Sequence, residues 1–300
     1  MPDAIRHIRN AAIDRARWDA AISAAPNGVI YARSLYLDHM APGWEALVQG
    51  DYEAVFPLPL RRKWGVAYGY HPFLTAQLGL FAPTVSRDLL NQFFNAIPSS
   101  VRYLDFSLNA GNLFGNTVFP LFRRTNFVLP LDSNYDTLCR GYRENIRRNL
   151  KKSVQYGCVP ETGVPLEEIV TLARAHATDE AGLAAFARLF ALLEKEGAAR
   201  TYGVRNRQGE LLASAAFLFD ERRAYYILVG NHPNGRTLGA SHALIDAFIR
   251  DEAGSGRILD FEGSDLRNLA FFYSSFGARE EPYAALRVNR LPWWMKWLKK

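Results

Sequence analysis

The sequence is poor in cysteine and has no long apolar run. Its two cysteines, Cys139 and Cys158, show no metal-ligand spacing and are expected to be reduced structural thiols. The six histidines form no ligand motif, so we expect no metal. The longest apolar runs are too short to span a membrane, and the first residues lack the apolar core of a secretion signal. These absences predict a cytoplasmic protein.

Apolar and aromatic residues, in contrast, are plentiful. Hydrophobic residues make up 49% of the chain and aromatic residues 13%, which is enough for a sizeable core and excludes wholesale disorder. At 300 residues the chain is too long for one ordinary domain and suits two of middling size. We expect a division into residues 1–134 and 135–300.

The net charge of +6 is concentrated in one short segment. Six cations stand there against Glu144 alone: Arg140, Arg143, Arg147, Arg148, Lys151 and Lys152. The rest of the chain is nearly neutral, which argues against a diffuse nucleic-acid-binding surface. Arg143, Arg147 and Lys151 are spaced four apart and would share one helix face. That face would suit CoA phosphates, tRNA or anionic lipid; alternatively, it is an ordinary solvated surface.

Hydrophobic periodicity and turn residues predict the elements of the first half. Pro57 and Pro59 place their strand at a sheet edge or at a bend. A cap at Thr84 or Ser86 is expected to begin the second helix. The predicted helices cover residues 13–23 and 84–96, and the predicted strands cover 44–49, 53–60, 66–70, 76–81, 102–106 and 122–131.

The second half predicts helices on both faces of a mixed sheet. Its expected helices are 135–155, 166–177, 182–196, 238–250 and 265–276, and its expected strands are 200–205, 211–219, 223–229, 257–261 and 283–288. This order indicates an α+β fold with a mixed, mainly antiparallel sheet flanked by helices. The first half follows the same pattern more loosely.

Two short motifs within this order resemble the GNAT superfamily of acyltransferases. Members often carry Gln/Arg-x-x-Gly-x-Gly/Ala at the start of the helix after the central strand. Segment 236–241 matches it at Arg236 and Gly239 and departs from it at Ser241. Members often end the next helix with Tyr-x-x-x-Gly, as Tyr273 and Gly277 do here.

A third segment resembles one branch of this superfamily. Residues 143–152 resemble the basic opening helix of FemAB-like proteins, which carry two GNAT-like domains. The resemblance covers residues 135–290 by motif and residues 1–134 by architecture only. It implies two GNAT-like domains and acyl transfer to an amine.

The resemblance implies an acyl-CoA site at two places. Backbone N–H groups at the start of a helix suit a pyrophosphate, Gly239 would let phosphate approach closely, and Arg236 would add a charged fork. Backbone amides of the central strand would hold the thioester carbonyl. The implied cofactor-binding residues are Leu228, Val229, Gly230, Arg236, Gly239, Ala240 and Ser241. Alternatively, the loop is a plain turn with Thr237 as an ordinary cap.

Acyl transfer to an amine needs a base and an acid. Tyr273 stands where the family often places the tyrosine that protonates the leaving thiolate; alternatively, it is a core aromatic beside Phe271, Phe272 and Phe276. Glu262 follows the strand 257–261 and would act as the base. Asp260 points to the same face and would be either a base or a helix cap.

One departure concerns the donor. FemAB-like aminoacyltransferases often read Phe-Lys-x-x-Phe-Gly where this chain has Tyr273 in place of the lysine. We therefore expect an N-acyltransferase that moves an acyl group from acyl-CoA to a small-molecule or peptide amine. The alternatives are an aminoacyltransferase fed by charged tRNA and a non-catalytic binding protein. Segment 68–79 would suit an acceptor pocket between the domains, and the Trp- and Lys-rich tail 292–300 would suit peripheral membrane contact.

Overall fold

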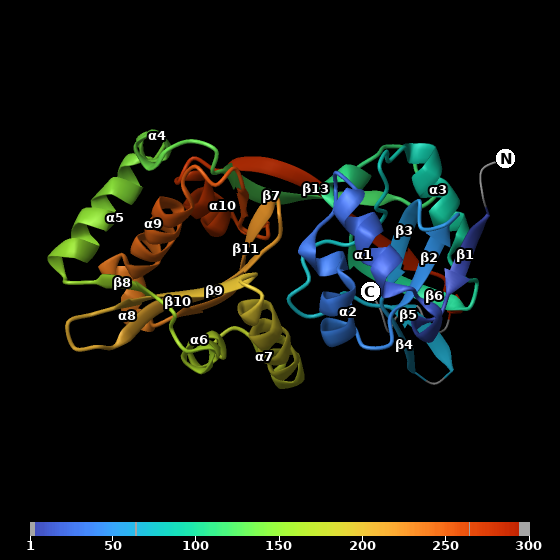
Figure 1. The fold of residues 1–300 in the computed structure, drawn as a ribbon, viewed down its shortest axis with the longest axis horizontal. Helices are drawn as coiled ribbons and strands as arrows, with labels where there is room; N and C mark the ends of the chain where they lie inside the picture. The colour runs from blue at the N-terminus through green and yellow to red at the C-terminus, as the bar shows by residue number, and fades with distance from the viewer. Residues whose placement is uncertain (1–3, 64, 264, 294–300) are drawn as a thin grey trace. The chain divides into compact units, whose positions relative to one another are not determined.

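The structure is a computed structural model that describes residues 4–63, 65–263 and 265–293 (Figure 1). The chain forms two compact units. Unit 1 comprises Met1–Arg124 and Pro282–Lys300, and unit 2 comprises Thr125–Glu281. Unit 2 is therefore inserted into the chain of unit 1. This arrangement differs from the expected division after residue 134, because the last strand returns to the first unit.

Unit 1 begins with a small antiparallel sheet of order β1-β2-β3. Its strands are β1 (Ile5–Ile8), β2 (Glu45–Gln49) and β3 (Ala54–Leu58). Pro59 follows β3 and lies before β4 (Leu60–Lys63), which belongs to a different sheet. The bend expected at the prolines is confirmed, because a residue without an N–H ends the ladder there.

The second sheet of unit 1 has the order β4-β5-β6-β13. It contains β5 (Val66–Gly69), β6 (Val101–Ser107) and β13 (Arg279–Asn289), and β5 runs parallel to β6. The helices of the unit are α1 (Arg15–Ala24), α2 (Ser34–Met40) and α3 (Arg87–Ala96). Ser86 caps α3, since its hydroxyl accepts the Leu89 N–H at 3.1 Å. Aromatic rings of Phe56, Phe93, Phe94 and Phe106 pack at the centre of this unit.

The predicted strand over 76–81 is wrong. Leu78 and Phe81 form only isolated bridges, to Leu108 and Val55. Buried side-chain amides take the place of a strand partner, because Asn109 and Asn112 both donate to the Leu80 carbonyl. The segment is therefore held by amide side chains instead of a continuous ladder.

The sheet of unit 2 has the order β7-β12-β11-β10-β9-β8. Only the β11–β12 pair is parallel among the pairings described within this unit. The strands are β7 (Leu121–Pro130), β8 (Val159–Thr162), β9 (Ala199–Arg205), β10 (Leu211–Phe219), β11 (Arg223–Asn231) and β12 (Ile258–Asp260). The mixed, mainly antiparallel arrangement confirms the predicted α+β class.

Helices cover both faces of this sheet (Figure 1). They are α4 (Tyr135–Arg140), α5 (Glu144–Gln155), α6 (Leu166–Ala173), α7 (Glu180–Lys195), α8 (Pro233–Leu238), α9 (Ala240–Glu252) and α10 (Arg267–Ser274). Helix α9 packs on β9 and β10, where Phe248 stacks on Phe217 with ring centroids 3.8 Å apart. No helix among the described residues is both long and apolar enough to cross a membrane.

The basic helix expected over 135–155 is broken into α4 and α5. The break lies at Gly141, and the next residue, Tyr142, is buried. The Arg143 N–H donates to the Ser275 carbonyl at 2.9 Å, which fastens the start of α5 to the end of α10. Because the chain turns into the core between the two helices, one continuous helix cannot form. Residues 294–300 of the expected membrane tail lie outside the described residues.

Candidate active site

Strand β11 is paired on both sides for only part of its length. It pairs with β10 from Ala224 to Asn231, with a register shift between Ala216 and Phe217 of β10. Its pairing with β12 stops at Tyr225. In the described part of the chain, residues 226–231 therefore have no strand partner on the β12 side. We call this stretch the open edge of β11; it matches the splayed central strand that the family resemblance implies.

The three strand residues expected to hold a carbonyl do not contribute equally. The His232 N–H donates to Leu212 of β10 at 2.9 Å. Because N–H groups alternate along a strand, the Gly230 N–H also faces β10, and the Val229 N–H faces the open edge. Val229 is thus the residue of the three best placed to donate to a bound carbonyl, while Leu228 belongs to the β10 side.

Gly230 has a packing role. A Cβ at this position would lie 2.6 Å from the Leu172 Cβ and 3.1 Å from the Ala173 backbone nitrogen, both in α6. No side chain fits between β11 and α6 here. The glycine is needed for this close approach whether or not a ligand binds on the other side.

One side of Gly239 in the predicted phosphate loop is occupied by α5. Gly239 joins α8 to α9 in a left-handed conformation, with φ of 76°. A Cβ on Gly239 would lie 2.6 Å from the carbonyl oxygen of Asn149 in α5. The close approach that Gly239 permits is therefore made by α5, and a pyrophosphate does not fit against this face of the glycine.

The other loop residues are also engaged within the fold. Ala240 is fully buried, and the Ser241 hydroxyl donates to the Asn231 side chain at 2.7 Å. The backbone of Arg236 lies in α8, and its side chain lies outside the described structure. The segment between β11 and α9 was predicted to be a loop but forms the short helix α8, and Gly239 at its end contacts α5.

Tyr273 lies in α10 and is almost completely buried, with 7% of its surface exposed. Its ring stacks on Phe261 at 4.5 Å, and Phe261 in turn contacts Tyr226 on the open edge, at 6.1 Å. Burial and, secondarily, the charge of Glu262 raise the pKa of Tyr273. The phenol is therefore protonated at neutral pH. The structure shows Tyr273 as a packed aromatic, and its role as the proton donor stays a prediction.

Glu262 has an uncommon backbone conformation at the end of β12. Its φ is 62°, and Gly263 follows with φ of 88°. The Glu262 N–H donates to the Asp260 carboxylate at 2.8 Å, which holds this turn. A non-glycine residue in the left-handed region is strained, and such strain is often found at functional sites. The predicted base and the predicted acid, Glu262 and Tyr273, are thus neighbours.

Asp260 belongs to a buried polar network. Its carboxylate pairs with Arg223 at 2.9 Å and accepts from the Asn126 amide at 2.8 Å. Arg223 also forms a two-pronged ion pair with Glu281, at 2.8 and 2.9 Å. Burial raises the pKa of Asp260, against the opposing effect of Arg223. Asp260 does not cap α10, because the N-cap of this helix is Leu266 and no side-chain cap hydrogen bond is formed there, so the predicted cap is wrong. The role of Asp260 as a base stays a prediction.

Sequence reasoning missed His242, which lies in the first turn of α9. Its ring meets Phe272 edge-on at 5.0 Å, and its Nδ1 is buried without a hydrogen-bond partner. Burial lowers the pKa of His242 to about 4. No ligand motif marks this histidine, so a pattern search could not single it out.

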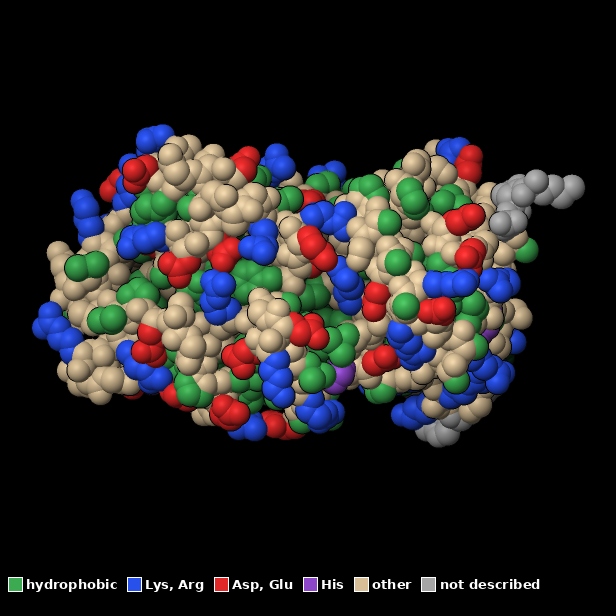
Figure 2. Space-filling view, in the orientation of Figure 1, with side chains coloured by type: hydrophobic (Ala, Val, Ile, Leu, Met, Phe, Trp, Pro, Cys, Tyr) green, Lys and Arg blue, Asp and Glu red, His purple; other side chains and the backbone are tan. Residues whose placement is uncertain are grey.

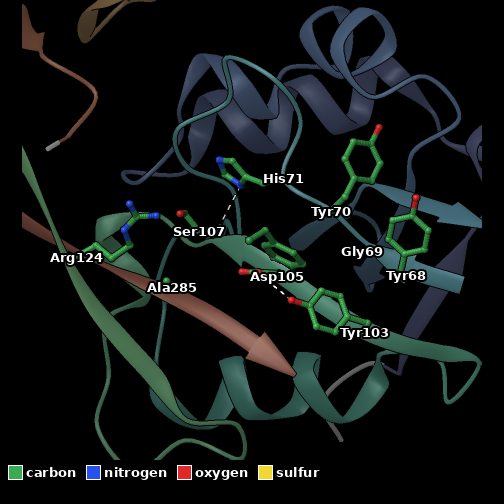
Figure 3. A pocket seen from close by; sticks show the side chains of 10 residues that line it. Tyr68, Gly69, Tyr70, His71, Tyr103, Asp105, Ser107, Arg124 and Ala285 are labelled. Carbon is green, nitrogen blue, oxygen red and sulfur yellow. Dashed lines mark hydrogen bonds between the residues drawn. The ribbon is translucent and has the colours of Figure 1, made fainter. Parts of the chain in front are cut away.

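Unit 1 contains a pocket of about 340 Å³ (Figure 3). Four residues of segment 68–79 line it, namely Tyr68, Gly69, Tyr70 and His71, together with Tyr103, Asp105, Phe106, Ser107, Arg124 and Ala285. The Tyr103 hydroxyl donates to Asp105 at 2.9 Å, and the Ser107 N–H donates to His71 Nδ1 at 3.4 Å. The lining mixes aromatic faces, a guanidinium and hydroxyl groups, which suits a polar organic ligand.

Metal chemistry has no site in the described residues. No group of three His, Cys, Asp or Glu side chains within them could hold a metal ion. Cys139 and Cys158 are both free thiols.

Comparison with known protein families finds a match to the central part of the chain. Residues 140–267 match the model of the acetyltransferase (GNAT) domain. This range contains the open edge, α9 and the Glu262 turn. No curated protein matches the sequence.

Solved structures resemble the chain over nearly its whole length. A crystal structure of FemX is 13% identical with a TM-score of 0.66, and covers 98% of this chain and 99% of its own. A tandem GNAT protein from the clavulanic acid biosynthesis pathway is 13% identical, with 96% and 99% coverage and a TM-score of 0.53. The C-terminal domain of a putative lysylphosphatidylglycerol synthetase from Agrobacterium fabrum is 12% identical, with 93% coverage of both chains and a TM-score of 0.57. At these identities the likeness concerns the fold. Residues 140–267 thus match a GNAT domain, and the chain as a whole has a fold like those of FemX and of the tandem GNAT protein.

Proposed function

We propose that the protein is an N-acyltransferase that transfers an activated acyl group to an amine. One observation carries the proposal: the open edge of β11 leads directly to Glu262 and Tyr273. Tyr226, the first residue of the open edge, is linked to Tyr273 through the ring of Phe261. The charge of Glu262 acts on the buried Tyr273 phenol, and Glu262 follows β12, whose pairing with β11 ends at Tyr225.

Each group has one task in the proposed reaction. The amine attacks the acyl carbon and loses its proton to Glu262. The oxyanion that forms accepts a hydrogen bond from the Val229 N–H. The carbon–leaving-group bond then breaks, and Tyr273 gives its proton to the leaving atom. The raised pKa of Tyr273 keeps that proton available at neutral pH. Transfer of the Glu262 proton to the tyrosinate restores both residues, so the cycle balances.

Acyl-CoA is the first candidate for the donor. The GNAT domain match supports it. The contact of Asn149 with Gly239 argues against a pyrophosphate on that loop, so CoA would have to bind without it. Calorimetric titration with acetyl-CoA tests whether acyl-CoA is the donor. We expect saturable binding below millimolar acetyl-CoA. A flat titration at millimolar acetyl-CoA would remove acyl-CoA as the donor.

Aminoacyl-tRNA is the second candidate, and the covered loop favours it. An aminoacyl ester needs no pyrophosphate cradle, so the α5 contact at Gly239 is no obstacle to it. The similarity to FemX and to a putative lysylphosphatidylglycerol synthetase gives further support. Incubation with tRNA charged with radiolabelled amino acids would show transfer of label to an added amine.

Acyl transfer itself can be tested before the acceptor is known. Hydroxylamine is a small amine that yields a hydroxamate from either donor, and we expect faster hydroxamate formation with the protein than with its Glu262→Gln variant. The acceptor in the cell is proposed to be a small-molecule or peptide amine. If neither donor gives more hydroxamate with the protein than without it, the proposed function is wrong.

A further inference from the structure

The outward face of α5 is strongly cationic. Arg143 at its N-cap, Arg147, Arg148 and Lys151 are all exposed, whereas Glu144 is the single acid of the helix. None of these four cations forms an ion pair with a carboxylate in the part of the chain that the structure describes. Figure 2 shows blue side chains spread over the α5 end of the molecule, with green patches between them.

Apolar side chains are exposed at the C-terminal end of α5 and just beyond it. Arg147, Lys151 and Val154 are four and three residues apart, so they lie in one row. Val154 is 72% exposed, and beyond the helix Tyr156 and Val159 are 54% and 61% exposed. A valine that is largely exposed next to arginines and lysines does not contribute to the core.

The N-terminal end of the face is also apolar. Phe271 of α10 is 54% exposed, and the Arg143 guanidinium lies 5.4 Å from the centre of its ring. The Arg143 N–H bond to the Ser275 carbonyl fixes the two helices to each other at this point. The result is a row of cations with exposed apolar groups at both ends, which we call the α5 face.

We propose that the α5 face docks the protein on an anionic membrane surface. Cations attract the negatively charged headgroups, and apolar side chains beside them enter the boundary with the acyl chains. A nucleic acid would satisfy the cations but would leave Val154 and Val159 in water. The combination of charge and aliphatic exposure therefore favours a lipid surface as the partner.

The α5 face has enough charge for measurable but reversible binding. Each basic residue near an anionic leaflet contributes about a fivefold gain in binding, so four of them give a gain of several hundredfold. This attraction weakens with salt, because surface charges are screened over roughly 10 Å at 0.1 M. The contribution of the apolar side chains to membrane binding is expected not to change with salt concentration.

Vesicle flotation tests the proposal with the full chain. We expect binding to vesicles of phosphatidylcholine mixed with phosphatidylglycerol and little binding to phosphatidylcholine alone. Arg147→Gln with Lys151→Gln should weaken binding about 30-fold. Val154→Ser with Tyr156→Ser should weaken it at both low and high salt. The matched control is Arg188→Gln with Lys195→Gln, which removes two exposed charges from α7 and should change nothing.

Three results would overturn the proposal. The first is equal binding, or none, to neutral and anionic vesicles. The second is loss of binding in the α7 control to the same degree as in the α5 variant. The third is retention of tRNA that depends on Arg147 and Lys151 but not on Val154 and Tyr156, without vesicle binding; this would assign the face to nucleic acid. The hydroxamate assay is independent of all three, because it needs no membrane.

Discussion

Gly239 and Asn149 meet backbone to backbone, because the Asn149 carbonyl oxygen lies 2.6 Å from the point that a Gly239 Cβ would occupy. This contact joins α5 to the start of α9. It places α5 against one side of the glycine of the predicted phosphate motif. The motif is therefore present in the sequence, but its glycine serves a helix contact.

Gly239→Ala should destabilise the protein through both conformation and space. The left-handed φ costs about 1–2 kcal/mol for any residue with a Cβ, and the clash with α5 adds about 1–3 kcal/mol. Gly209→Ala is the matched control, since its φ is 80° but a Cβ there would meet nothing within 4 Å. Urea unfolding measures the loss in the free energy of unfolding for each of the two variants. Equal losses in the two variants would show that α5 moves away freely.

Tyr273→Phe should slow acyl transfer by roughly a hundredfold or more while leaving the free energy of unfolding nearly unchanged. The phenyl ring keeps the stack on Phe261, and only the transferable proton is lost. Tyr226→Phe is the control, because Tyr226 is a buried neighbour whose hydroxyl has no proposed task. Hydroxamate formation under single-turnover conditions measures the effect. Unchanged turnover in Tyr273→Phe would make this tyrosine a packing residue only.

Two substitutions at Glu262 separate its backbone strain from its carboxylate. Glu262→Gln keeps the positive φ of 62° and removes the charge. Glu262→Gly removes the charge and relieves the strain, so it should be more stable than Glu262→Gln by about 0.5–1 kcal/mol. Both variants should lose acyl transfer. Activity retained in either variant would exclude Glu262 as the base.

Protonation of His242 should destabilise the protein in mild acid. Its folded pKa is about 4, below the ordinary value of 6.5, so the unfolded chain binds the proton more readily. The contribution of neutral His242 is complete above pH 6.5 and is lost as pH falls towards 4, with a total of up to about 3 kcal/mol. His242→Phe should flatten this part of the stability–pH curve in urea titrations. Parallel curves for the two proteins would contradict the assignment.

Local patterns predicted the unit 2 sheet well, since the strands around Ala213 and Tyr225 are long, apolar and separated by clear turns. They missed β1, α2 and β8, which are short and carry weak periodicity. The break at Gly141 was missed because it depends on Tyr142 reaching the core. At the site, sequence order placed Glu262 and Tyr273 close together.

The contact between Gly239 and α5 could not be predicted from the sequence. Asn149 and Gly239 are far apart in the chain, and neither residue has a local signal for the other. The same holds for the Arg223–Asp260–Glu281 network, whose members come from three separate strands. A sequence motif shows which family a segment resembles. Which side of that segment is accessible to a ligand depends on the residues that pack against it.

The insertion of unit 2 between the two parts of unit 1 has a consequence for synthesis of the chain. Strand β6 pairs with β13 at Ser107 and Ala285, so the sheet of unit 1 lacks one strand until nearly the whole chain has left the ribosome. Unit 2 is continuous, from Thr125 to Glu281, and can collapse while translation proceeds. Unit 2 is thus ready to fold before unit 1, whose sheet is complete only after β13 has been synthesised.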